Sequence, residues 1–227
     1  MEKAERPLIE FRNVKKTYKV GDTLVHALNG IDLKLMPGEI CCIVGTSGSG
    51  KSTLLNVSAG LERVSSGEII VSGRHIEKLS ESNLILFRQK YVGFIFQSFN
   101  LMPYYTAVEN VAFPLAFRGI NKQKREKKAK ELLCEVGLET HLNHKPTQLS
   151  GGQQQRVGIA RALVTNPNII FADEPTGNLD SVTSREVMEL ICGIVRKQGK
   201  TLIMVTHDKQ MAEYGDKVIT LIDGKIV

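Results

Sequence analysis

Nine consecutive residues, 45–53, combine glycines, hydroxyl side chains and one lysine at a spacing that suits a polyphosphate. Glycine lets backbone N–H groups approach an anion closely, because no Cβ stands in the way. Lys51 would reach the β- and γ-phosphates, and the Ser52 hydroxyl is placed to ligate Mg²⁺. The residues that we expect to contact the phosphates are Gly45, Thr46, Ser47, Gly48, Ser49, Gly50, Lys51, Ser52 and Thr53.

Two elements must position this loop. An apolar run, Ile40–Val44, precedes it, and Leu54–Val57 continue after it at helical spacing. The order is therefore strand, glycine-rich loop and helix, with G-x-x-x-x-G-K-S in the loop. The helix would aim its positive N-terminal end at the same anion. A flexible Gly/Ser turn is the alternative interpretation, but the flanking elements favour a nucleotide phosphate site.

A second group with chemical potential is Asp173-Glu174, which follows the apolar run Ile169–Ala172. A buried parallel strand ends at the mouth of an α/β sheet, where the glycine-rich loop also opens. Asp173 would help to hold Mg²⁺, and Glu174 would orient and polarise an attacking water. Alone this pattern is common at strand ends; beside the glycine-rich loop it indicates phosphoryl chemistry.

A third group, Ser150–Gln153, precedes a helical stretch that carries Val157, Ala160 and Val164 on one face. Ser150 is a good N-cap, and Gly151-Gly152 would leave backbone amides open to phosphate oxygens. An ordinary capped helix that begins with glycines would look the same. The residues alone leave both interpretations open.

The rest of the chain predicts an α/β fold. Residues 8–35 alternate apolar and polar side chains, with turn signals at Val20–Asp22 and Asn29-Gly30, which indicates antiparallel strands. Buried strands that alternate with helices indicate a mostly parallel sheet. Further strands are expected at 66–73, 91–96, 168–172 and 201–205, with a helix at 182–197 and a closing hairpin at 218–227.

One domain is expected over residues 1–227. Its catalytic core, with the antiparallel part, comprises 8–97 and 166–227. Leucines at helical spacing among charged residues predict an inserted helical subdomain over about 98–165.

Composition is ordinary for a globular protein, with 42% hydrophobic residues and a net charge of +6. The basic stretch Lys122–Lys130 favours a solvated helix face, with anionic lipid as the alternative, and we expect no nucleic-acid partner. The N-terminus lacks the pattern of a signal peptide, and no apolar run is long enough to span a bilayer. Four cysteines in apolar surroundings favour buried thiols in a reducing cytosol.

Taken together, the motifs resemble the ATP-binding-cassette (ABC) ATPase family over essentially the whole chain. Gly45–Ser52 matches Walker A, Leu149–Gln153 the family signature and Ile169–Asp173 Walker B. The strings at 94–103 and 172–180 resemble the branch of macrolide-efflux, lipoprotein-release and cell-division ATPases (MacB, LolD and FtsE).

The resemblance implies roles for further residues. Glu174 would be the catalytic glutamate, and His207 the switch histidine that contacts the γ-phosphate. Gln97 would join Ser52 and Asp173 at Mg²⁺. Tyr18 would stack on adenine, although a strand aromatic that packs on a neighbour would look the same.

The resemblance also implies a homodimer with two ATP molecules sandwiched head to tail. The residues that would contact ATP in trans are Ser150, Gly151, Gly152, Gln153 and Asp180. An integral membrane permease subunit would dock near Gln97–Tyr105, which would place the protein in the cytoplasm, peripheral on the inner face of the cell membrane. The alternatives are a soluble ABC-type ATPase that acts on nucleic acid or ribosomes, and a P-loop kinase.

Overall fold

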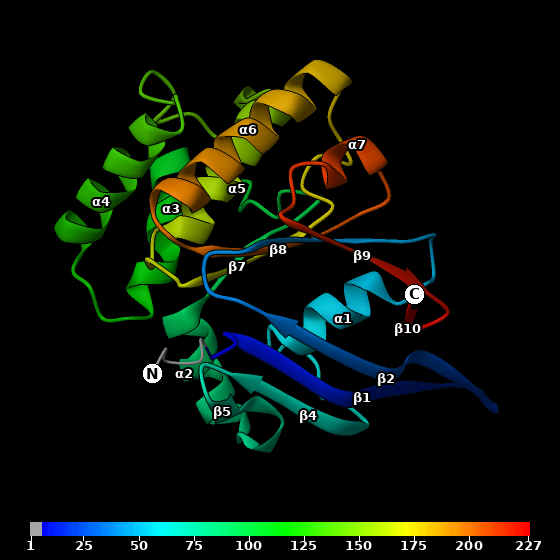
Figure 1. The fold of residues 1–227 in the computed structure, drawn as a ribbon. Helices are drawn as coiled ribbons and strands as arrows, with labels where there is room; N and C mark the ends of the chain where they lie inside the picture. Colours follow the sequence, from blue (N-terminus) through cyan, green and yellow to red (C-terminus); the bar gives the residue numbers. More distant parts are fainter. Residues whose placement is uncertain (1–5) are drawn as a thin grey trace, which may run out of the picture.

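The core of the fold is a six-stranded sheet, seen in a computed structural model that describes residues 6–227 (Figure 1). Its strand order is β10-β9-β3-β8-β7-β6, parallel except for β10. The strands are β3 (Ile40–Val44), β6 (Val92–Ile95), β7 (Ile169–Asp173), β8 (Thr201–Thr206), β9 (Lys217–Ile222) and β10 (Lys225–Ile226).

A second sheet is antiparallel, with the order β2-β1-β4-β5. Its strands are β1 (Ile9–Val20), β2 (Thr23–Leu35), β4 (Ser66–Val71) and β5 (Arg74–His75). Helix α1 (Lys51–Ser58) lies between the two sheets (Figure 1). Leu54 and Leu55 of α1 are fully buried in one cluster with residues of both sheets, so the position of α1 is fixed from both sides.

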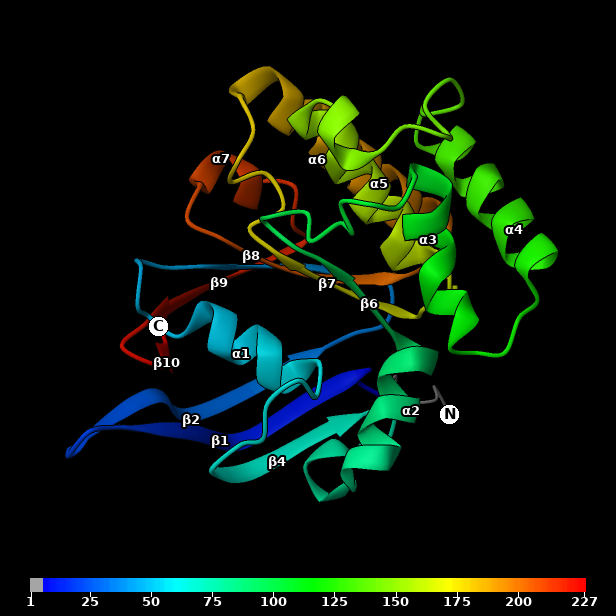
Figure 2. The same cartoon turned by 180° about the vertical axis from the view of Figure 1, so that it is seen from behind.

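The remaining helices gather on the other face of the six-stranded sheet, except α2, which lies beside β4 and β5 (Figure 2). The α-helices other than α1 are α2 (Glu81–Tyr91), α3 (Ala107–Ala116), α4 (Lys122–Glu135), α5 (Gly151–Leu163), α6 (Ser181–Lys197) and α7 (Lys209–Ala212). Short 3₁₀ turns lie at Ile76–Lys78 and Pro146–Gln148. Alternate residues of the central strands face opposite clusters: Phe171 faces α1, whereas Ile170 and Ala172 face the helices. This explains why the strands read as continuous apolar runs.

The predicted strands and helices are confirmed at most positions, and the fold is the expected α/β class with an antiparallel N-terminal sheet. The turn expected at Asn29-Gly30 is wrong. Val14 pairs with Ile31 and Lys15 with Asn29, so Gly30, at φ 79°, is the extra residue of a bulge inside β2.

Two further features differ from expectation. Helix α2 was not predicted; it is mainly polar and buries Leu84 and Phe87, a weak periodic signal. Cys134 is exposed, whereas Cys41, Cys42 and Cys192 are buried as expected. Burial raises the pKa of the Cys41 and Cys42 thiols to about 12, so both stay protonated at neutral pH. Among the helices of residues 6–227, none has the length and apolarity to span a bilayer.

Candidate nucleotide site

The glycine-rich loop is shaped by its own packing as well as by room for a ligand. A Cβ on Gly45 would lie 2.3 Å from the carbonyl oxygen of Leu221 in β9. A Cβ on Gly50, at φ 102°, would lie 2.2 Å from the carbonyl oxygen of Ala27 in β2. Any side chain at either position would push the loop off its neighbouring strands, so these glycines fix where the loop sits.

Helix α1 begins with an open N-terminus. Gly50 is its N-cap, no side chain caps it, and its first turn carries no acidic residue. Its first N–H groups and positive dipole end are therefore available to an anion. Lys51 is only 6% exposed, and its Nζ donates to the carbonyl oxygens of Gly45 and Thr46, both at 2.8 Å. The ammonium is thus already held against the loop.

A cavity of about 570 Å³ opens in front of this helix end. Its lining residues are Ala27, Ser47, Gly48, Gly50, Lys51, Ser52, Thr53, Glu174 and His207. Most predicted loop residues therefore meet Glu174 and His207 around one space. Gly45, Thr46 and Ser49 are not on the lining, and the Ser49 side chain is buried, at 3% exposed.

Ser52 and Asp173 come together at the edge of this cavity, because α1 begins where β7 ends. Ser52 Oγ donates to Asp173 Oδ1 at 3.1 Å. Burial, with Glu174 beside it, raises the pKa of the Asp173 carboxyl against the opposing effects of Ser52 and Lys51. A hydroxyl and a carboxylate that crowds another carboxylate fit Mg²⁺, which prefers oxygen ligands and would relieve the repulsion.

Gln97 does not line the cavity, and its side chain is bonded to Asn178, not to Ser52 or Asp173. Its Nε2 donates to Asn178 Oδ1 at 3.4 Å, and Asn178 Nδ2 donates to the Gln97 carbonyl oxygen at 3.1 Å. The structure thus brings together two of the three residues predicted for Mg²⁺. It links the third to the loop after β7.

Glu174 and His207, the two residues predicted to be catalytic, are hydrogen-bonded to each other. His207 Nδ1 lies 3.0 Å from Glu174 Oε2, so the imidazole orients the carboxylate. Glu174 has a left-handed backbone, at φ 44°, and its N–H donates to the Val205 carbonyl oxygen at 3.0 Å. Strained non-glycine residues cluster at functional sites. Nothing in the local sequence signals this conformation.

Tyr18 is placed differently from the prediction. Its ring lies beside Lys16, with Nζ 4.8 Å from the ring centroid, and its hydroxyl donates to Glu62. Burial and Glu62 raise the pKa of the Tyr18 phenol. Tyr18 is half-buried and does not line the cavity. Its role in adenine stacking therefore stays a prediction.

Ser150 and Gln153 are joined by two reciprocal hydrogen bonds. Ser150 Oγ accepts from the Gln153 N–H at 3.3 Å, and Gln153 Oε1 accepts from the Ser150 N–H at 2.9 Å. This is a capping box. Asp180 likewise caps α6, accepting from Val182 N–H and Thr183 N–H, each at 3.0 Å, and from Thr183 Oγ1 at 2.6 Å. Neither group lines the cavity of its own chain.

The region after Gln97 carries exposed aromatics. Tyr104 is 84% exposed and Tyr105 41%, whereas Phe99 is half-buried. A groove of about 240 Å³ runs between α2, β6, α3 and α5, and Tyr105 is connected to its lining residue Phe117 through the ring of Phe113. Its apolar lining includes Phe94, Phe96, Pro114 and Phe117. The α2 side of this groove was not predicted from the sequence, because the polar composition of α2 gives a weak helical signal.

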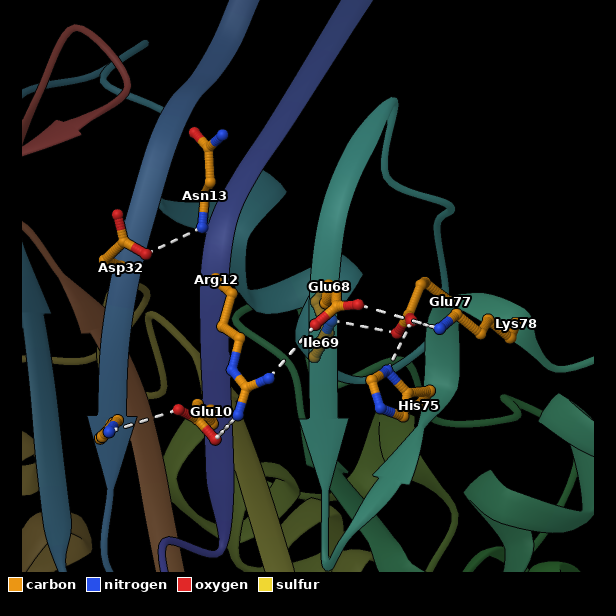
Figure 3. A network of polar contacts seen from close by, with 10 residues as sticks. Glu10, Arg12, Asn13, Asp32, Glu68, Ile69, His75, Glu77 and Lys78 are labelled. Carbon is orange, nitrogen blue, oxygen red and sulfur yellow. Dashed lines mark hydrogen bonds and ion pairs between the residues drawn. The ribbon is translucent and has the colours of Figure 1, made fainter.

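Another group of possible metal ligands lies on the antiparallel sheet, where Glu68, His75 and Glu77 have ligand atoms within 4.8 Å of one another. Figure 3 shows that neighbours already occupy them. Arg12 Nη1 lies 3.4 Å from Glu68, Lys78 Nζ 3.8 Å from Glu68, and Glu77 Oε2 accepts from the Ile69 N–H. We interpret this group as an ion-pair network that ties β4 to β1 and β5.

The fold and the cavity define a P-loop nucleotide-binding protein: a glycine-rich loop from β3 to α1, faced by Asp173 and Glu174 at the end of β7. A family model described as "ABC transporter" matches residues 28–177. The chain therefore belongs to the ABC transporter ATP-binding family, and the predicted resemblance is confirmed.

Relatives place the chain more closely. It is 48% identical to the macrolide export ATP-binding/permease protein MacB of Pasteurella multocida over 98% of this chain and 34% of that protein. It is 46% identical to the lipoprotein-releasing system ATP-binding protein LolD of Geobacter metallireducens over 97% and 98% of the two chains. The chain thus spans about a third of the length of the MacB protein.

A solved structure with the same fold is the dimeric, post-hydrolysis ATP-binding cassette MJ0796 of Methanocaldococcus jannaschii, bound to ADP and phosphate. It is 44% identical, with a TM-score of 0.89 over 96% of both chains.

Proposed function

We propose that this chain hydrolyses ATP as a homodimer that sandwiches two ATP molecules and drives a conformational change in an integral membrane partner. One observation carries the proposal. Within residues 6–227, α1 has an open N-terminus at the expected phosphate site, α5 begins with two glycines, and the N-terminus of α5 does not line the cavity at α1. A second copy would supply the missing wall. The dimeric state of the MJ0796 structure supports this arrangement.

The chemistry would be divided among few residues. The α1 amides and Lys51 would bind the phosphates, and Ser52 and Asp173 would hold Mg²⁺, which neutralises phosphate charge when bound. Glu174 would orient water for in-line attack and accept its proton, held in place by His207. In trans, the amides of Gly151 and Gly152, with Ser150, would contact the γ-phosphate.

The membrane partner would dock at the groove between α2 and α3. The groove is apolar, and the exposed Tyr105, connected through Phe113 to Phe117 on the lining, is a residue that suits a protein interface. The MacB name joins an ATP-binding part to a permease, and the LolD name describes a lipoprotein-releasing system, which supports a permease partner here. The chain would then lie in the cytoplasm against the inner face of the membrane. Export, lipoprotein extraction and mechanotransmission would all use this coupling.

Glu174→Gln tests the proposal. The amide cannot accept the proton, so turnover should fall at least about 100-fold while Mg-ATP still binds. Dimers should then accumulate with ATP in analytical ultracentrifugation. Glu213→Gln, an exposed acid on the segment after α7, is the matched control and should hydrolyse ATP at the parent rate.

Two results would contradict the proposal. Hydrolysis by Glu174→Gln at the parent rate would remove Glu174 from its role. Turnover by the parent only after a phosphate acceptor is added would indicate a kinase instead of an ATPase.

A further inference from the structure

The segment that follows Gln97 contains an unusual bend. Phe99 and Asn100 are consecutive non-glycine residues with left-handed backbones, at φ 59° and 50°. Asn tolerates this conformation, but Phe99 is disfavoured there by contact between its Cβ and the backbone, so contacts from elsewhere would stabilise the bend. The bend lies at the start of the segment 98–105, which leads to the exposed Tyr104 and Tyr105.

Arg161 of α5 supplies such contacts. Its guanidinium donates to the carbonyl oxygen of Phe99 at 2.7 Å and to that of Asn100 at 2.5 Å. Its Cζ also lies 5.9 Å from the centroid of the Phe96 ring. Within residues 6–227 no ion pair includes Arg161, so the charge of this half-buried side chain is directed at backbone carbonyls. A planar fork that spans two adjacent carbonyls specifies their relative orientation.

The same bend reaches the other end of α5. The tip of the Phe99 ring lies 3.8 Å from the position of a Cβ on Gly151, the first glycine of the Ser150–Gln153 turn. The Phe99 carbonyl oxygen lies 3.9 Å from a Cβ position on Gly158. Gly151 and Arg161 are ten residues apart, which is roughly 15 Å of helix. Phe99 therefore lies beside α5 near Gly151 and Gly158, and its carbonyl oxygen is bonded to Arg161.

We propose that Arg161 is a positioning residue that fastens the Phe99-Asn100 bend to α5, so that segment 98–105 and the Ser150–Gln153 turn move as one body. This inference rests on the proposed function, because it assigns the path by which docking at the groove reaches the trans phosphate contact. Displacement of segment 98–105 by a partner would displace the turn with it. In the isolated chain, the clamp would keep the turn oriented toward a second copy.

The clamp should matter for dimerisation and leave nucleotide binding by one chain unchanged. A monomer binds ATP through α1 and the P-loop, which Arg161 does not touch. Without the clamp the turn would sample more orientations, and association would lose the advantage of preorganisation. Lysine keeps the charge but cannot span two carbonyls with a planar fork.

The experiment uses the Glu174→Gln chain with Mg-ATP. Adding Arg161→Lys should weaken ATP-dependent dimerisation at least about tenfold in sedimentation velocity. The affinity of the monomer for a fluorescent ATP analogue should stay within about twofold. Hydrogen exchange should accelerate at the amides of residues 98–101. Phe99→Ala, which keeps the Arg161 bonds but removes the ring beside Gly151, should give a smaller loss.

Arg118→Lys is the matched control. Arg118 also bridges two carbonyl oxygens, those of Thr165, at 2.9 Å, and Gln89, but it does so beyond the C-terminal end of α5. It should leave dimerisation within about twofold of the parent. Circular dichroism checks that each variant folds.

The outcomes separate this inference from the function on which it rests. If Glu174→Gln alone forms no ATP-dependent dimer, the proposed function is wrong. If it dimerises and Arg161→Lys dimerises equally well despite faster exchange at residues 98–101, the clamp is only structural. If both Arg161→Lys and Phe99→Ala fail to fold, or if Arg118→Lys weakens dimerisation as strongly, the specific link to the turn is rejected.

Discussion

Two helices of this protein begin after glycine-rich turns, yet their N-termini are opposite in chemistry. Helix α1 starts at Gly50, which offers no side-chain cap, and its N-terminus lines a cavity of about 570 Å³. Helix α5 starts at Ser150, whose capping box with Gln153 occupies two backbone donors. Two different glycine-rich turns have thus produced one open and one partly closed helix N-terminus.

This difference indicates that the N-termini of α1 and α5 act in different steps, ATP binding and dimer assembly. An uncapped helix N-terminus leaves its first N–H groups without intrahelical partners, so α1 gains most from a phosphate. At α5 the box leaves mainly the amides of Gly151 and Gly152, which can add contacts without being required for the helix. We therefore expect α1 to determine ATP binding by one chain and α5 to determine assembly of two chains.

The largest expected effect is at the open end. Lys51→Met should weaken ATP binding at least about 100-fold, or about 2.7 kcal/mol, because a charge-assisted contact to phosphate is lost. The apo protein should also lose stability, since the carbonyl oxygens of Gly45 and Thr46 lose their donor. Isothermal titration calorimetry and thermal melts measure the two effects. Lys209→Met, at an exposed lysine on α7, is the control. Equal ATP affinity of the two variants would show that the N-terminus of α1 does not determine ATP binding through Lys51.

The open end was predictable because its information is local. The spacing of Gly45, Gly50, Lys51 and Ser52, between an apolar strand and a helix, already indicates a phosphate site. The meeting of Ser52 with Asp173 was also predictable, since strand ends of a parallel sheet share one edge.

What was missed depends on contacts between distant segments. The left-handed backbone of Glu174 and the bond of Tyr18 to Glu62 have no local signature. Helix α2 was missed because two buried side chains, Leu84 and Phe87, decide it. The Gly30 bulge was taken for a turn, because glycine at positive φ serves both and only the pairing partner distinguishes them.

A smaller effect is expected at the closed end. Ser150→Ala and Ser80→Ala each remove an N-cap hydroxyl, that of α5 and that of α2, and each should cost about 1 kcal/mol of stability. Only Ser150→Ala should also slow ATP turnover, by roughly tenfold, because only α5 would meet a second copy's phosphate. Urea unfolding and a steady-state phosphate assay measure both. Equal turnover in the two variants would mean that α5 is an ordinary capped helix.

The smallest effect is expected at a third N-terminus, that of α6, which Asp180 caps with three accepted hydrogen bonds. These bonds, Thr183 first, lower the pKa of the Asp180 carboxyl below its usual value. A lowered folded-state pKa means that the stabilisation is complete above the unfolded pKa, about 3.9, and is lost as pH falls through the folded value. Asp180→Asn keeps a good cap, so stability at pH 7 should barely change.

The parent and Asp180→Asn should therefore diverge only in acid. The parent should lose more stability than the variant as pH falls below about 4, because only the parent has a carboxylate there to protonate. Urea midpoints from pH 7 down to pH 3 measure this, and a constant difference would show that the pKa is not lowered. The rate of ATP turnover at pH 7 decides whether Asp180 also contacts the ATP of a second copy. A rate close to the parent's makes Asp180 a helix cap, whereas a loss of about tenfold or more, at unchanged stability, assigns it to the ATP of a second copy.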